Sequence, residues 1–301
     1  MKVLIGCDVD PILTPKLNQP PQWDIWEPLS RISDLLTVMG ENLPPITWLI
    51  RSDESVRFCT GDYASGFLSR EKLWSDLVAR GHELGWHMHP FTYDRSYGAF
   101  LFDEHPQWLG AAHAALAAHY DVRATRTGWD YGSDFLFGEL AKLGIEIDFS
   151  AIPGNRVWQR FGPSTVNVDW LRCPERPYRP SATDYQRPGD DSLPLVQVPI
   201  AQFRNSMPGQ IKRYAWRLRN GCFTLRGLDR KTRLLTDRWD GLPITDRDVW
   251  AFFFHPENLT PRGIQDFSRN VERLREQSAS EFVTATSLTR WLESPTPLEQ
   301  T

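Results

Sequence analysis

The feature that most constrains the fold of this chain is a regular alternation between short apolar runs and longer segments with helical periodicity. Residues 2–7 and 45–50 are apolar runs that end in polar residues, which predicts buried strands. Residues 26–39 and 69–80 place apolar side chains at helical spacing, and a further short strand follows Gly81. Strands that alternate with helices in this way predict a parallel sheet with helices outside it.

The alternation continues through most of the 301 residues. Helices are predicted at residues 107–119, 133–143, 262–277 and 287–292, and strands at residues 122–126, 145–150, 193–200, 249–254 and 281–286. Residues 91–106 are predicted to be an aromatic loop, suited to the wall of a substrate groove. Between residues 153 and 235 the rhythm is lost. We interpret this region as an elaboration on a single domain of residues 1–294, followed by a polar tail at 295–301.

Two carboxylates follow the first predicted strand, in Cys7-Asp8-Val9-Asp10-Pro11. In α/β folds the C-terminal ends of the strands are where sites are built. Asp8 and Asp10 are two residues apart, so they fit a general base beside a metal ligand, the pair that metal-assisted hydrolysis requires. Asp and Pro also simply terminate strands, which is the structural alternative.

Three of the seven histidines fall within Gly81-His82-Glu83-Leu84-Gly85-Trp86-His87-Met88-His89-Pro90. His87 and His89 are two apart on a predicted strand, so their side chains point to the same face. Two imidazoles at a strand end are a common way of binding a divalent metal, although a histidine-rich surface turn would look the same. His255 follows the apolar strand 249–254, a position better suited to catalysis than to packing.

Composition excludes several classes of protein. Apolar residues make up 41% of the chain, enough for a sizeable core, and the net charge of -4 gives no bias toward nucleic acid or membrane. The four cysteines form no C-x-x-C pair, as is usual for reduced thiols. The N-terminal apolar run is too short for a signal peptide, and no stretch of about 18 apolar residues could span a bilayer. We therefore expect a soluble, cytoplasmic protein with no nucleic-acid partner.

Two compositional features bear on the substrate. The chain has thirteen tryptophans, a residue that often stacks on sugar rings, although most of them are expected in the core. Basic residues gather between residues 210 and 233. A solvated helical face explains them, and recognition of an acidic or phosphate-bearing ligand is the alternative.

Taken together, these motifs resemble the NodB-homology polysaccharide deacetylases, carbohydrate esterase family 4, over about residues 2–291. The motifs that carry the resemblance are Asp8-Val9-Asp10, Gly81-His82-Glu83-Leu84-Gly85 with His87, Arg126-Thr127-Gly128-Trp129 with residues 140–148, and Phe253-Phe254-His255-Pro256. The resemblance implies an irregular (β/α)7 barrel. Two features depart from the family pattern: Val9 separates aspartates that are usually adjacent, and the metal histidines are two rather than four residues apart.

The resemblance also implies roles for particular residues. Asp10, His87 and His89 would hold one divalent metal ion, foremost Zn²⁺, with Co²⁺, Ni²⁺ or Mn²⁺ as alternatives. The catalytic residues would be Asp8 as base, Arg126 paired with it, and His255 as proton donor, although the roles of Asp8 and Asp10 could be exchanged. His82, Glu83, Trp129 and Asp148 would support the site or contact substrate.

The activity implied by the resemblance is removal of an acyl group, foremost acetyl, from an N-acylated sugar or glycan precursor. This substrate would be a small molecule or an oligosaccharide, and a phosphate-linked sugar would suit the basic segment. Hydrolysis of a non-sugar amide, or carbohydrate binding without turnover on the same barrel, are the alternatives.

Overall fold

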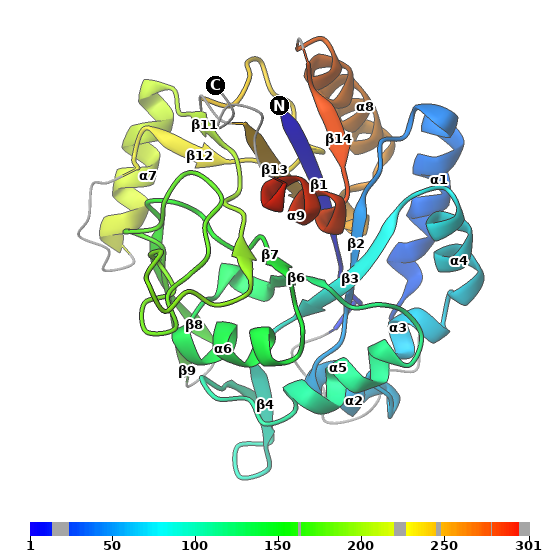
Figure 1. Cartoon of the computed structure of the whole chain (residues 1–301), viewed down its shortest axis with the longest axis vertical. Coiled ribbons are helices and arrows are strands. Elements are labelled where there is room, and N and C mark those ends of the chain that lie inside the picture. The colour runs from blue at the N-terminus through cyan, green and yellow to red at the C-terminus, as the bar shows by residue number, and fades with distance from the viewer. Residues whose placement is uncertain (14–23, 162–163, 220–226, 245–247, 278, 295–301) are drawn as a thin grey trace.

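The computed structural model describes residues 1–13, 24–161, 164–219, 227–244, 248–277 and 279–294 (Figure 1). The predicted polar tail at residues 295–301 lies outside the described residues, as do Cys222 and Arg226.

A parallel sheet forms the centre of the molecule, with helices around it (Figure 1). Seven of its strands follow one another in space in chain order: β1 (Lys2–Val9), β2 (Thr47–Arg51), β3 (Glu83–Met88), β6 (Ala124–Thr127), β7 (Ile147–Asp148), β10 (Val196–Gln197) and β13 (Val249–Phe254). β13 pairs with β1, and Ile200, just beyond β10, forms a parallel bridge to Ala251 of β13. The sheet thus closes on itself, which confirms the predicted irregular (β/α)7 barrel. A short strand, β14 (Glu281–Val283), also pairs with the start of β1.

Six of the long helices are those expected from the periodicity, and three helices are additions. The long ones are α1 (Ser30–Met39), α4 (Glu71–Ala79), α5 (Leu109–Ala117), α6 (Asp134–Lys142), α7 (Met207–Arg219), α8 (Pro261–Arg275) and α9 (Ala285–Glu293). The additions are α7, in the region where the rhythm is lost, and α2 (Glu54–Thr60) and α3 (Ser65–Leu68), which follow β2. Single-turn 3-10 segments are η1 (Glu27–Leu29), η2 (Gly40–Asn42), η3 (Gly128–Asp130) and η4 (Pro256–Asn258).

Side-chain alternation along β1 separates the two faces of the barrel wall. Val3 and Ile5 pack outward against the helices, while Leu4 and Gly6 face the interior. A Cβ on Gly6 would lie 2.2 Å from the ring of Phe149, so only glycine leaves room for this phenylalanine inside the barrel. The next inward-facing position of β1 is Asp8, which lies closer to the C-terminal end of the strand than these apolar residues.

Helix α9 closes the end of the barrel where the strands begin, and it lies across the near end in Figure 1. The backbone N–H of Ala285 donates to Thr47 Oγ1 at the start of β2, and Thr286 donates to Glu83 at the start of β3. A site in the barrel can therefore open only at the opposite end, where the strands finish.

Two regions differ in detail from the sequence expectation. Residues 91–106, predicted as a loop, contain an antiparallel hairpin of β4 (Phe91–Asp94) and β5 (Ala99–Phe102), because Tyr93 and Phe100 pack together with Phe58. The region 153–235 carries two more antiparallel strand pairs, β8 (Arg156–Phe161) with β9 (Ser164–Asp169) and β11 (Gln202–Arg204) with β12 (Arg230–Thr232), and α7 lies between β11 and β12 in the chain.

The sequence also predicts reduced cysteines and no segment that spans a membrane. Cys7, Cys59 and Cys173 are buried free thiols. None of the helices in the described ranges is long and apolar enough to cross a bilayer.

Candidate active site

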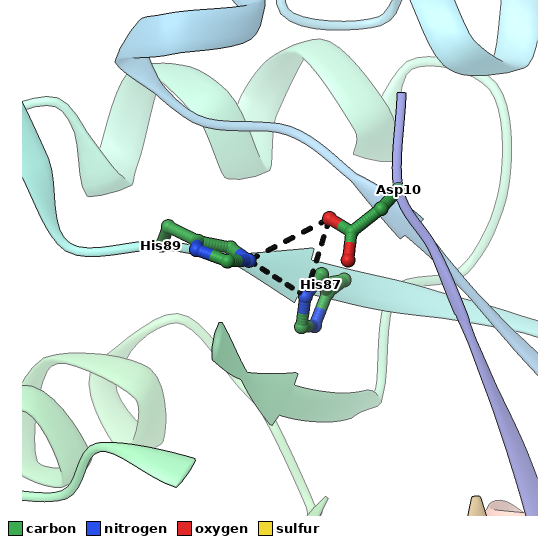
Figure 2. A group of neighbouring side chains, drawn as sticks. All are labelled: Asp10, His87 and His89. Carbon is green, nitrogen blue, oxygen red and sulfur yellow. Dashed lines mark hydrogen bonds and ion pairs between the residues drawn. The ribbon is translucent and has the colours of Figure 1, made fainter. Parts of the chain in front are cut away.

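Asp10, His87 and His89 converge at the C-terminal end of the barrel, and Figure 2 shows their side chains pointing toward one another. His87 is the fifth residue of β3 and His89 follows that strand, so both imidazoles lie on its inner face. The two Nε2 atoms are 3.1 Å apart. Asp10 Oδ1 is 3.6 Å from Nε2 of His87 and 3.5 Å from Nε2 of His89.

These three atoms fit a divalent metal. Bonds of 2.0–2.1 Å in a tetrahedral arrangement place neighbouring ligand atoms about 3.3 Å apart, close to the three distances found here. Two imidazole nitrogens and one carboxylate oxygen form a donor set that suits Zn²⁺ and similar ions. Three protein ligands leave coordination positions open, as in catalytic rather than structural sites.

The protonation of the histidines agrees with a ligand role. His87 Nδ1–H donates to the backbone carbonyl of Arg126 at 2.6 Å, which leaves the lone pair of Nε2 facing the other two ligands. Burial, assisted by the positive charge of Arg51, lowers the pKa of His89 to about 4, so this imidazole is neutral near pH 7. Burial raises the pKa of Asp10, but His87 and Arg51 outweigh it, and the net pKa lies well below the ordinary range.

Arg51 and Asp53 support this group and were not singled out as site residues from the sequence. Arg51 Nη1 donates to Asp10 Oδ1 at 3.0 Å, and its Nε donates to Asp53 Oδ2 at 2.7 Å. The same oxygen of Asp53 accepts from the backbone N–H of His89. The available signal was their position, because Arg51-Ser52-Asp53 ends an apolar strand as Asp8 and His87 do.

A second charged group lies beside the first. Asp8 is fully buried and its Oδ2 accepts from Arg126 Nη1, while Arg126 Nη2 donates to Asp130. The guanidinium carbon of Arg126 lies 3.7 Å from the ring centroid of Phe253, which fixes its plane. Asp8 Oδ1 is buried without a hydrogen-bond partner among the described residues, so its lone pairs remain available.

His255 faces both carboxylates from the end of β13. Its Nε2 is 3.6 Å from Asp8 Oδ2 and 3.8 Å from Asp10 Oδ2. Its Nδ1 lies 3.2 Å from Asn258 Oδ1, which also accepts from the His255 backbone N–H. Asn258 thus orients the ring so that Nε2 points toward the site.

The Arg126-Thr127-Gly128-Trp129 segment forms the rim of the site. A Cβ on Gly128 would lie 2.3 Å from Cδ2 of His89, so the imidazole rests directly on the glycine backbone. Trp129 and Asp130 both adopt positive φ (61° and 55°), a conformation that is strained for side-chain-bearing residues and tends to occur at functional sites. Trp129 is 41% exposed, and its ring makes an edge-to-face contact with the His89 ring.

Three predicted supporting residues lie away from this group. His82 and Glu83 are at the start of β3, the opposite end from His87. There His82 Nδ1 accepts from the backbone N–H of Ile46, and Glu83 binds Thr286 of α9. Asp148 is paired with Thr125 in the sheet register, so it points to the face opposite Arg126, where it accepts from the Thr125 hydroxyl.

Comparison with known proteins places this geometry on a known fold. No protein-family model matches the sequence, and no curated protein matches it. The crystal structure of a putative polysaccharide deacetylase from Mycobacterium smegmatis is similar over 96% of this chain and 89% of that chain, with a TM-score of 0.55 and 15% identity. A probable polysaccharide deacetylase from Pseudomonas aeruginosa PAO1 is similar over the same shares, with a TM-score of 0.49 and 10% identity. On the first of these similarities, the chain has a barrel fold of the polysaccharide deacetylase type.

Proposed function

We propose that the protein is a metal-dependent hydrolase that removes an acyl group, foremost acetyl, from an N-acylated sugar. The observation that carries this proposal is the presence of two carboxylates in different settings at one strand end. Asp10 faces two imidazole nitrogens, whereas Asp8 faces Arg126 and His255. One carboxylate is thus available as a ligand and the other as a base.

Asp10, His87 and His89 would hold the ion. A divalent metal held there supplies Lewis acidity, which activates the acyl carbonyl and the attacking water. Arg51 shares Asp10 Oδ1 and keeps this carboxylate oriented toward the imidazoles. The outer contact of His87 with the Arg126 carbonyl fixes its tautomer.

The proton transfers would be carried out by Asp8 and His255. Asp8 takes a proton from the attacking water through its unpaired Oδ1, while Arg126 donates a hydrogen bond to its Oδ2. His255 donates a proton from Nε2 to the departing amine, while Asn258 holds the other ring nitrogen. His255 Nε2 lies 3.6 Å from Asp8 Oδ2, so the proposed proton donor and the proposed base are close enough to act on one substrate group.

A sugar substrate is supported by the rim of the site and by the fold. Trp129 offers a half-exposed aromatic face next to His89, of the kind that stacks on a pyranose ring. The Mycobacterium smegmatis structure with a similar fold is described as a putative polysaccharide deacetylase. A phosphate on the sugar stays a prediction.

Metal content is the first test. We expect about one Zn²⁺, Co²⁺, Ni²⁺ or Mn²⁺ per chain by elemental mass spectrometry of untagged protein. Asp10→Ala and His87→Ala should lose the ion, while Asp8→Asn should retain it because Asp8 is assigned as base. His119→Ala, which alters an exposed histidine beyond the end of α5, is the matched control and should retain the ion.

Turnover is the second test, measured as acetate release from N-acetylglucosamine oligomers and from a non-sugar acetanilide. Asp8→Asn and His255→Gln should each lower kcat by about 10²–10⁴ while retaining the metal. Release from the anilide alone would replace the sugar substrate with a simple amide. No bound metal after incubation with each ion, or no release from either substrate by the loaded protein, would refute the proposed hydrolase.

A further inference from the structure

Helix α7 exposes its apolar side chains, unlike an ordinary surface helix. Met207, Ile211, Tyr214 and Leu218 are spaced by four, three and four residues, so they lie on one face of the helix within about 60°. Their exposed fractions are 68%, 63%, 43% and 47%. We call these four residues the apolar stripe.

The side of α7 that faces the protein is cationic. Arg217 is only 1% exposed and its Nη2 lies 3.4 Å from the Gly154 carbonyl, while Arg213 donates to the carbonyl of Arg230 on β12. Figure 1 shows α7 at the edge of the molecule, beside β11 and β12 and away from the barrel strands. The polar face thus anchors the helix, and the apolar stripe points outward.

The segment of sequence that contains the stripe is strongly basic, although the whole chain has a net charge of -4. Residues 204–233 contain nine Lys or Arg and one acidic residue, Asp229, so the segment has a net charge of 9 − 1 = +8. Lys212 and Arg219 are exposed and project about 110–130° from the centre of the stripe, both on the same side of the helix. An occupant of this face should therefore combine apolar groups with negative charge.

A second copy of the chain does not meet this requirement. Two copies meeting at their stripes would bring two basic α7 helices together, with no acidic residue on α7 to compensate. The area is also too small. A 13-residue helix is about 20 Å long and 10 Å wide, so one face covers about 200 Å², against about 800 Å² per partner in a stable interface.

We propose that α7 docks the protein on an anionic membrane surface. The apolar stripe enters the boundary between headgroups and acyl chains, and Lys212 and Arg219 bind lipid phosphates, as in interfacial amphipathic helices. The helix lies in the membrane plane and does not span it. This inference is independent of the proposed hydrolase activity.

The test is sedimentation of the full-length protein with lipid vesicles. We expect binding to phosphatidylcholine vesicles that contain about 30% phosphatidylglycerol, little binding to pure phosphatidylcholine, and weakening by NaCl. Ile211→Glu/Leu218→Glu should lower the affinity at least about tenfold. The matched control is Val38→Glu/Val78→Glu, which makes the same changes at exposed apolar positions of α1 and α4 and should leave binding unchanged.

Three results would overturn the proposal. The first is absence of binding to anionic vesicles by wild-type protein whose circular dichroism spectrum shows it to be folded. The second is an equal loss of binding in the stripe and control variants. The third is a dimer in light scattering that Ile211→Glu/Leu218→Glu converts to monomer, which would identify a second copy as the occupant.

Discussion

Gly128 controls, at the scale of a single residue, how close His89 comes to the other two candidate ligands. Because a Cβ would lie 2.3 Å from Cδ2 and 2.4 Å from Nε2 of His89, Gly128→Ala must displace the imidazole. We expect Zn²⁺ affinity to fall by at least about tenfold, measured by competition with a chromophoric chelator. Gly138→Ala in α6 is the control, since a Cβ there meets nothing within 4 Å. Equal affinities in the two variants would contradict the placement of His89.

His82 predicts a pH dependence of folding stability. Burial, with a contribution from Arg80, lowers its pKa to about 4, against about 6.5 in the unfolded chain. Between these values the unfolded chain binds a proton that the folded protein does not, so this residue makes stability fall as the pH falls from about 6.5 to about 4. Between pH 7 and pH 5, His82 should account for a loss of about 2 kcal/mol in the free energy of unfolding.

His82→Asn tests this contribution of His82 to the pH dependence of stability. The variant removes the titrating imidazole, while the amide oxygen can still accept from the Ile46 backbone N–H. Urea unfolding of metal-free protein at pH 7 and pH 5 should show a smaller acid-induced loss of free energy in His82→Asn than in wild type. The exposed His119→Asn should behave as wild type. An acid-induced loss that is unchanged in His82→Asn would rule out the assigned pKa.

At the scale of elements, Asp53 joins β2, α2 and the segment that follows β3. As the N-cap of α2 it accepts from the backbone N–H groups of Ser55 and Val56, and its other oxygen binds Arg51 and His89. Asp53→Ala should therefore lower the free energy of unfolding and also weaken Zn²⁺ binding by about 10–100-fold. Ser133→Ala removes the cap of α6 and should cost about 1 kcal/mol with unchanged Zn²⁺ affinity. Comparable metal affinities in both would show that Asp53 acts only as a cap.

At the scale of the whole molecule, the region 153–235 is built into the barrel. β10 is one of the barrel strands, and Trp170, Val198 and Ile200 belong to the same apolar core as Leu4 of β1. We therefore expect this region to unfold together with the barrel, as one domain.

Cys7 in β1 and Cys173 in the region 153–235 are both buried and can report on the two parts separately. In variants that keep one of these cysteines and have serine at the other three positions, both thiols should become reactive over the same range of urea concentration. Reactivity of Cys173 at clearly lower urea would reveal an independent unit.

The alternation of strands and helices could be read from the sequence alone, because the hydrophobic periodicity that encodes it is local. It also indicated which strand ends carry candidate site residues, since Asp8, His87, Arg126 and His255 each lie at or just after the end of a predicted strand. The structure brings these four together with Asp10; their catalytic roles stay predictions.

Which strand ends meet, and which way each side chain points, depends on how the chain folds in three dimensions. Closure of the barrel pairs β1 with β13, which lie at opposite ends of the chain, and so places His255 beside Asp8. The register of β6 and β7 turns Asp148 to the face of the sheet opposite Arg126, and the curvature of the wall brings Arg51 onto Asp10. Register and curvature are set by contacts between residues far apart in the chain, and no local pattern encodes them.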